Sequence, residues 1–253
     1  MRTLCATLVL MLAGVGCGST PNKSDGSVTG MGSFVPLTLL NHWKYEVKAP
    51  DGTISSKVQT VVAEELVGGF YADTMAFRLV TGNKVADPEG DRSWQAWVPV
   101  DGGGSRLLRY REQTVDGNDG FVKNESYWEP PRLRLDDTPA RVAAGAAWRE
   151  PDYTETKTDM DRVDGGLDSF IPDGGMTTSL PQQDGWMVVS PGQSITVPAG
   201  TFNALALRRV GNGGSSIKNF WFARDVGKIR ETEENQPTEE LSSYLVQAAA
   251  TAK

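Results

Sequence analysis

Apolar and polar residues alternate along most of the chain between residues 34 and 247. In the segment NHWKYEV at 41–47, the large apolar side chains recur at every second position. A period of two is typical of a β-strand with one buried face. Asp-Gly turns separate such segments and favour hairpins. The pattern predicts an antiparallel meander of five strands over residues 41–47, 56–66, 75–81, 94–100 and 107–110.

The stretch Val197–Arg230 has the clearest strand and turn signals in the sequence. A Pro-Ala-Gly turn leads into a strand over 201–210, and a Gly-rich turn leads into an aromatic strand over 217–223. Because Gly200 permits a positive φ, the first turn can aim Phe202 toward the core. The glycines are interpreted as turn residues, since no strand-to-helix context makes them a phosphate-binding loop.

The middle of the chain is less regular. We expect a strand over 121–128, and two prolines at 130–131 then prevent a continuous central strand because proline has no N–H to donate. The Ala-rich segment 140–148 is either a short helix or an ordered extended loop. The other expected elements are a strand over 148–157, a long acidic loop over 159–184, a strand over 186–189, and a last strand or short helix over 240–247.

The N-terminus matches an export signal. A basic residue, an apolar run too short to span a membrane and several small residues precede Cys17. This segment resembles the lipobox of bacterial lipoproteins, in which the cysteine carries acyl chains and becomes the first mature residue. Ordinary signal-peptidase cleavage is the alternative. The sequence predicts a signal peptide over 1–16, lipidation of Cys17, a flexible tether over 17–33, a single β domain over 34–247 and a frayed C-terminus over 248–253.

Charge and cysteine content exclude several classes of function. The chain has 253 residues and a formal net charge of −7, which argues against binding nucleic acid or docking on anionic lipid headgroups. Its 2 cysteines are Cys5, inside the signal, and Cys17. The mature domain therefore has no disulfide, thiolate metal ligand or cysteine nucleophile. Membrane attachment then depends on the acyl chains of Cys17.

Few side chains suit catalysis or metal binding. The single histidine, His42, lies on the polar face of the first strand and has no second His or Cys with which to form a zinc site. Asp159, Asp161 and Asp164 are weak calcium candidates, because their spacing departs from the EF-hand pattern and a solvated loop is simpler. No carboxylate pair stands out for glycoside hydrolysis, and the acidic run at 231–234 is interpreted as a solvated turn. We expect no cofactor.

Aromatic residues give the strongest indication of a binding site. Core packing is the first explanation for aromatics that alternate in strands. A curved sheet lined with them can also leave an apolar concavity, which is the usual site for a lipid-like ligand. Trp94 and Trp97 have opposite parity, so one of them should face solvent or a partner. The candidate ligand-binding residues are Trp43, Tyr45, Phe77, Trp97, Phe202 and Trp221.

Four motifs resemble those of a family of bacterial lipoproteins to which no activity is assigned. They are NHWKY at 41–45, VPAGTF at 197–202, FWFA with VGKI within 220–229, and ELSSY at 240–244. The resemblance covers residues 34–247, with the acidic loop as an insertion. It implies a fold similar to the curved half-barrel of LolA- and LolB-type lipoprotein carriers, and it supplies no catalytic residues.

We therefore expect an all-β domain, a curved antiparallel sheet in the form of a half-barrel or open barrel, anchored by lipid in the cell envelope and facing the periplasm or the cell surface. The expected function is non-catalytic binding of an apolar ligand or lipid, which requires an apolar pocket of several hundred Å³, an order of magnitude typical of ligand sites. One alternative is a structural or assembly lipoprotein that contacts an envelope protein through an exposed patch or sheet edge. The other is a carboxylate-based hydrolase.

Overall fold

The alternating segments fold into strands of one antiparallel sheet. The computed structural model describes residues 32–160, 177–211 and 214–247. In these ranges it has 14 strands and no α-helix, and therefore no helix long and apolar enough to cross a membrane. The strands are β1 (His42–Lys48), β2 (Ile54–Gly68), β3 (Tyr71–Gly82), β4 (Asp91–Pro99), β5 (Ser105–Val115), β6 (Val122–Asp136), β7 (Ala147–Arg149), β8 (Tyr153–Asp159), β9 (Thr177–Gln182), β10 (Asp184–Val197), β11 (Gly200–Gly211), β12 (Ser216–Ala223), β13 (Gly227–Glu233) and β14 (Thr238–Leu245).

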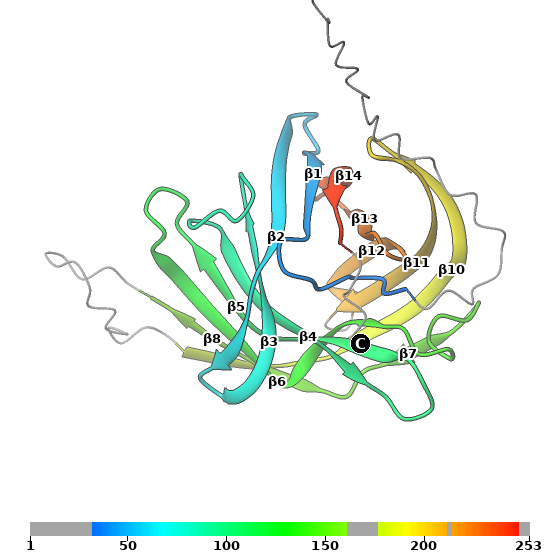
Figure 1. Cartoon of the computed structure of the whole chain (residues 1–253). Coiled ribbons are helices and arrows are strands. Elements are labelled where there is room, and N and C mark those ends of the chain that lie inside the picture. The colour runs from blue at the N-terminus through cyan, green and yellow to red at the C-terminus, as the bar shows by residue number, and fades with distance from the viewer. Residues whose placement is uncertain (1–31, 161–176, 212–213, 248–253) are drawn as a thin grey trace, which may run out of the picture.

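The order of the strands is β7-β10-β11-β12-β13-β14-β1-β2-β3-β4-β5-β6-β8-β9. The predicted meander is confirmed, since β1 to β6 are neighbours in sequence order. The sheet curves strongly (Figure 1), and among the described strands it does not close into a hydrogen-bonded barrel. We call the interior that its concave face encloses the hollow, although core side chains occupy much of it. The predicted all-β class and curved antiparallel sheet are confirmed.

A bent hairpin joins the two ends of this sheet. Strands β7 and β8 pair with β10 and β9, respectively. Strands β9 and β10 are consecutive in sequence, with only Gln183 between them. In the order of hydrogen-bonded strands, however, β9 is at one end of the sheet and β10 is next to the other end. The chain therefore passes directly from one end of the sheet to the other, and the hollow lies between the two halves.

Several boundaries in the middle of the chain differ from the sequence prediction. Residues 140–146 form turns instead of a helix, and Gly145 has a left-handed φ of 74° that ends any helical run. The expected strand over 148–157 is divided at Pro151 into β7 and β8. The end of the expected acidic loop is β9 and the start of β10, whereas residues 161–176 lie outside the described ranges. The last segment is a strand, β14.

Strand β6 continues through the two prolines that were expected to interrupt it. The ladder between β5 and β6 passes from Arg111 opposite Tyr127 to Arg109 opposite Arg132. Residues 128–131 therefore lie outside the ladder with β5, and the ladder with β8 ends at Glu129. The missing N–H groups of Pro130 and Pro131 thus remove no ladder hydrogen bond. The prolines interrupt the ladder and leave the strand intact.

Three apolar clusters form the core. The first joins β5 and β6 to β10, β11 and β12 across the hollow, the second centres on β1, β2 and β13, and the third lies between β3, β4 and β5. Trp94 is buried in the third cluster, whereas Trp97 packs on the first and donates its Nε1–H to the Val35 carbonyl at 2.8 Å. Trp94 is buried and Trp97 is half-buried, so the expectation that one of them faces solvent or a partner stays a prediction, and it now concerns Trp97.

Candidate functional site

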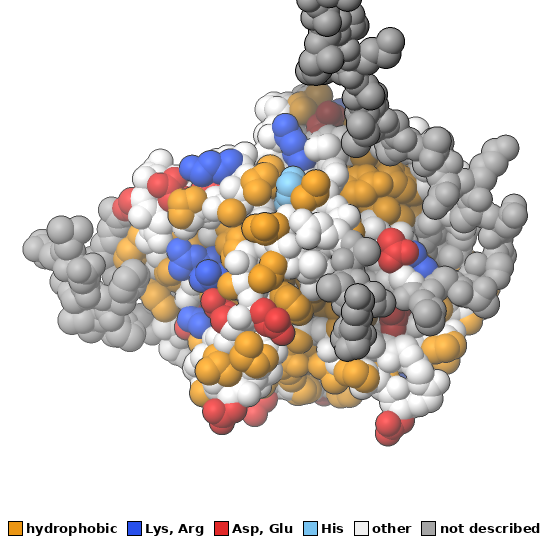
Figure 2. Space-filling view, viewed as in Figure 1, with side chains coloured by type: hydrophobic (Ala, Val, Ile, Leu, Met, Phe, Trp, Pro, Cys, Tyr) orange, Lys and Arg blue, Asp and Glu red, His pale blue; other side chains and the backbone are white. Residues whose placement is uncertain are grey.

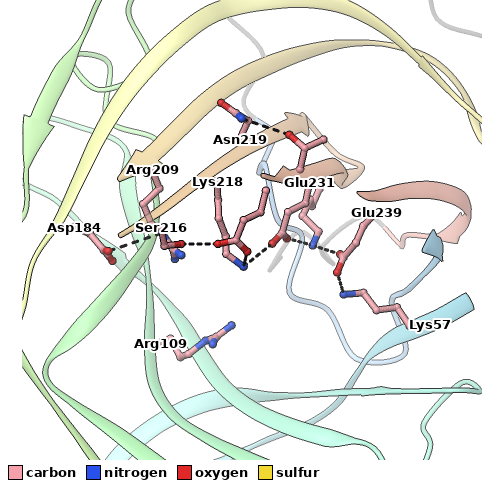
Figure 3. A network of polar contacts seen from close by, with 12 residues as sticks. Lys57, Arg109, Asp184, Arg209, Ser216, Lys218, Asn219, Glu231 and Glu239 are labelled. Carbon is pink, nitrogen blue, oxygen red and sulfur yellow. Dashed lines mark hydrogen bonds and ion pairs between the residues drawn. The ribbon is translucent and has the colours of Figure 1, made fainter. Parts of the chain in front are cut away.

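Charged side chains line the concave face of the sheet. Three lysines and three glutamates alternate from β2 across β14 and β13 to β12, and Figure 3 shows this sequence of contacts. Lys228 Nζ lies 2.7 Å from Glu239 Oε2, and Lys218 Nζ lies 3.4 Å from Glu231 Oε1. We call this set the charge row, and its members are Lys57, Glu239, Lys228, Glu231, Lys218 and Glu233.

The register of the strands explains the order of charges in this row. Lys218 and Glu233 lie directly opposite each other on β12 and β13, and their side-chain atoms are 2.9 Å apart. Glu231 and Glu239 are also opposite each other, on β13 and β14, where two like charges would repel. Lys228 bonds to both carboxylates and removes that repulsion. The interpretation of residues 231–234 as a solvated turn is therefore wrong for Glu231 and Glu233.

The ionic partners set the protonation of this row. Burial alone would lower the pKa of Lys228, but Glu231 and Glu239 raise it above its usual value. Burial alone would raise the pKa of Glu231, but Lys228 and Lys218 hold it well below its usual range. Burial raises the pKa of the Tyr45 hydroxyl, which donates to the Lys228 carbonyl at 3.0 Å. Lys228, Glu231 and Glu239 are therefore charged at neutral pH.

A second polar centre lies at the bend of the hairpin. Asp184, the first residue of β10, has a side chain that is only 2% exposed. Its Oδ2 accepts hydrogen bonds from Arg132 Nε at 3.0 Å and from the Tyr153 hydroxyl at 3.2 Å. Arg209 Nε lies 3.9 Å from Oδ1. One carboxylate thus connects β6, β8 and β11 at the point where the two ends of the sheet meet.

Beside the charge row, of which Lys228 is a member, the hollow contains a small cavity of about 60 Å³. Its lining combines apolar walls with three cationic and two amide side chains. No carboxylate lines it. The lining residues are Val35, Trp43, Tyr45, Gln59, Leu79, Gln95, Leu107, Arg109, Arg134, Phe222 and Lys228.

Irregular pairing places several polar residues in this lining. In the pairing of β4 with β5, the register shifts between Trp94 and Gln95, and Gln95 lies opposite Arg109. It shifts again where Arg134 is the extra residue of β6 opposite Leu107 and Leu108. On β13 the shift skips one residue and leaves Lys228 opposite Phe222. Bulges re-aim side chains and are frequent near functional sites, so their convergence on one cavity distinguishes this region.

The aromatic residues predicted to bind a ligand are only partly brought together. Trp43 and Tyr45 line the cavity. Phe77 and Trp97 pack against core clusters beside it. Phe202 stacks edge-on with Tyr244, and Trp221 donates its Nε1–H to Gln193 at 3.0 Å. The cavity that Trp43 and Tyr45 line has a volume of about 60 Å³, which is smaller than the several hundred Å³ that the hypothesis required.

The sequence did not identify Arg109, Arg134 or Lys228 as residues of the cavity. In the segment RLRLD at 132–136, alternation places the arginines on the opposite face from Leu133 and Leu135. The bulge at Arg134 reverses this arrangement. Because a bulge depends on the partner strand, no local signal in the sequence could have revealed it.

Neither His42 nor the weak calcium candidate Asp159 has a further metal-ligating side chain beside it in the described residues. His42 makes a contact of 3.1 Å with the Leu40 carbonyl. Asp159 pairs with Lys157 at 3.1 Å, whereas Asp161, Asp164 and Cys17 lie outside the described ranges. No group of three His, Cys, Asp or Glu side chains in those ranges could hold a metal ion.

Comparisons with known proteins return distant structures alone. No family model matches the sequence, and no curated protein does. A crystal structure of a "putative exported protein with YmcC-like fold" from Bacteroides fragilis aligns at 11% identity and a TM-score of 0.41, covering 85% of this chain and 99% of that one. A "putative lipoprotein" from Parabacteroides distasonis aligns at 11% identity and a TM-score of 0.33, with the same coverage of both chains.

Proposed function

We propose that the protein is a lipid-anchored lipoprotein of the cell envelope whose β domain is a non-catalytic binding module. The export signal over 1–16 and Cys17 support the address and the anchor. The observation that supports binding is the charged concave face. Desolvated charges cost free energy that apolar side chains of similar volume would not, so their concentration in one hollow favours a ligand-binding role.

The chemistry of the hollow favours a ligand with a polar, charged part over a purely apolar one. The cavity of about 60 Å³ holds only a small group, and an enclosed acyl chain does not fit beside the described side chains. Charged side chains continue outward from the cavity along the charge row, where Lys57 and Lys218 remain 30% and 27% exposed. An amphiphile with its charged group in the hollow is consistent with both features.

The hydrolase alternative receives no support from the carboxylates in the hollow. Glycoside hydrolysis requires one carboxyl group that stays protonated near neutral pH. Lysines hold the pKa values of Glu231 and Glu239 below the usual range, so neither can act as a general acid. Burial raises the pKa values of Asp91 and Glu150, but they lie on β4 and just after β7, which are not neighbours in the sheet.

Native mass spectrometry of the mature protein in a mild detergent tests the binding function. We expect an additional bound mass beyond the polypeptide and its acyl chains, and we expect 1 M salt to remove it because screening weakens partly exposed charges. Lys218→Gln should lower the bound fraction, whereas Lys44→Gln, an exposed lysine on the convex side of β1, is the matched control. Absence of any bound mass in all arms would contradict the proposal.

A second candidate, assembly with an envelope protein, is favoured by the tip of the β2–β3 hairpin. Leu66, Phe70 and Met75 are 56%, 66% and 50% exposed there. Figure 2 shows apolar side chains in several groups on one face of the molecule, separated by charged ones. Photo-crosslinking from position 70 in cells should give a discrete protein adduct if this tip is an interface. The same probe at Ile54, which is 60% exposed, is the control.

A further inference from the structure

Arg134 points into the interior of the protein, although its neighbours in sequence also face the core. Leu133 and Leu135 are 3% and 0% exposed and belong to the first apolar cluster. In a regular strand the residue between them would face the opposite side of the sheet. As the extra residue of the bulge in β6, Arg134 instead lines the small cavity in the hollow.

The guanidinium of Arg134 has no partner among the described residues. The neighbouring cations all do: Arg109 bonds to both oxygens of Glu112 at 2.8 Å, Arg132 bonds to Asp184, and Lys228 bonds to Glu231 and Glu239. No hydrogen bond or ion pair joins Arg134 to any residue of the described ranges. Five N–H donors therefore remain available on a half-buried side chain that lines the cavity.

The charges around the cavity leave an excess of positive charge. In the charge row, three lysines balance three glutamates. Arg109 is balanced by Glu112, and Asp184 is shared by Arg132 and Arg209. Arg134 then has no ion pair of its own. Glu231 acts on it only from beyond ion-pair distance, and burial together with the like charges of Arg109, Arg209 and Arg132 lowers its pKa well below its usual range. A buried cation in this environment is stabilised by an anion.

We infer that the cavity bounded by Arg109, Arg134 and Lys228 binds a single oxyanion group, a phosphate or carboxylate. A buried water needs at least about 10–15 Å³, so the cavity of about 60 Å³ holds about four waters or one small oxyanion. The planar fork of Arg134 suits two oxygens of such a group. The amides of Gln59 and Gln95 add polar lining, and Trp43 and Phe222 form apolar walls.

The oxyanion site deepens the proposed function. If the oxyanion is the charged group of a larger ligand, the inference rests on that proposed function. A free phosphate and the phosphate of an amphiphile present the same chemistry to the cavity. The experiment therefore uses three probes: inorganic phosphate, acetate and a short-chain phosphatidate. Each is titrated into the mature protein in a mild detergent and a buffer free of other oxyanions, and binding is measured by calorimetry.

Arg134→Gln removes the charge and the fork while keeping a polar side chain. We expect wild-type protein to bind phosphate or acetate at one site, and we expect Arg134→Gln to weaken that binding by at least about tenfold, since hydrogen bonds to charged groups are strong. Arg208→Gln makes the same change of charge at an exposed position of β11 and should bind as wild type does. Equal binding by Arg134→Gln, or no binding by wild type, would overturn the inference.

Thermal unfolding separates loss of binding from loss of folding. Without oxyanion, Arg134→Gln should unfold at the same temperature as wild type or higher, because it removes a charge that has no ion pair. A hundredfold excess of phosphate over its Kd should raise the Tm of wild type by about 5 °C and leave that of the variant unchanged. If Arg134→Gln fails to fold, Arg134→Lys takes its place, and it should bind phosphate more weakly than wild type.

The amphiphile arm distinguishes the two proposals. If phosphate binds through Arg134 but phosphatidate does not bind, the oxyanion site is supported and the amphiphile-binding function fails. If phosphatidate binds equally to wild type and Arg134→Gln, the binding function is supported and the oxyanion site fails.

Discussion

Lys228 holds two carboxylates together in the hollow, and its removal is the sharpest test of the charge row. In Lys228→Met the side-chain volume is nearly kept, but Glu231 and Glu239 lose the cation between them. The three side chains are 17%, 15% and 16% exposed, so solvent compensates only partly. Breaking a buried ion pair costs 3–5 kcal/mol, and the remaining contacts with Lys57 and Lys218 favour the lower end, about 3 kcal/mol.

The loss should depend on pH. In the wild type the folded-state pKa values of Glu231 and Glu239 are lowered, so their contribution to stability is complete above the unfolded value of about 4.3 and is lost as pH falls through the folded values. In Lys228→Met the cation that contributes most to lowering these pKa values is lost, so the pKa values rise and the stabilisation that the two carboxylates give above about pH 4.3 is reduced. The difference in stability between the two proteins should therefore be largest near pH 7.5.

Urea unfolding at pH 7.5 and pH 4.5 measures this difference. Lys228→Arg keeps the charge and is the matched control, with an expected loss well below that of Lys228→Met. If the free energy of unfolding of Lys228→Met at pH 7.5 is within about 0.5 kcal/mol of the wild-type value, Lys228 does not stabilise the two carboxylates. A loss of stability that is as large at pH 4.5 as at pH 7.5 would contradict the same claim.

Two further predictions concern the closure of the sheet and the anchor. Asp184→Asn leaves Arg132 and Arg209 without a counter-charge and should lower the free energy of unfolding by about 3 kcal/mol, whereas Tyr153→Phe, which loses one hydrogen bond to Asp184, should lower it by about 1 kcal/mol. Both are measured by urea unfolding, and equal effects would show that the carboxylate does not join the two ends. Cys17→Ser should remove the acyl mass seen by intact mass spectrometry and release the protein from the membrane fraction. A variant that keeps the acyl mass and stays in the membrane fraction would contradict lipidation of Cys17.

The strands were predictable because their signals are local. Alternation in 41–47 and turn residues near Gly52 and Gly200 are properties of neighbouring residues, and both glycines adopt the positive φ that such turns use. The same period applies to Trp221, one of the predicted ligand-binding residues. Since Phe220 and Phe222 face the core, Trp221 between them faces the other side, where it lies under Arg230.

The site was not predictable because it depends on partners far apart in sequence. The bulge at Arg134 exists only against β5, and the position of Lys228 depends on β12 and β14. Gln183 connects β9 to β10, and nothing local indicates that these strands pair at opposite ends of the sheet. Sequence patterning therefore identified which face of most strands is apolar, and it missed the charged residues that bulges turn inward.

The most direct test of the oxyanion site is a crystal structure of the protein grown with selenate, a tetrahedral oxyanion whose selenium is located by anomalous scattering. We expect an anomalous peak in the cavity, within hydrogen-bond distance of the Arg134 guanidinium and bordered by Arg109 and Lys228. Selenate bound elsewhere while this cavity contains only water would contradict it.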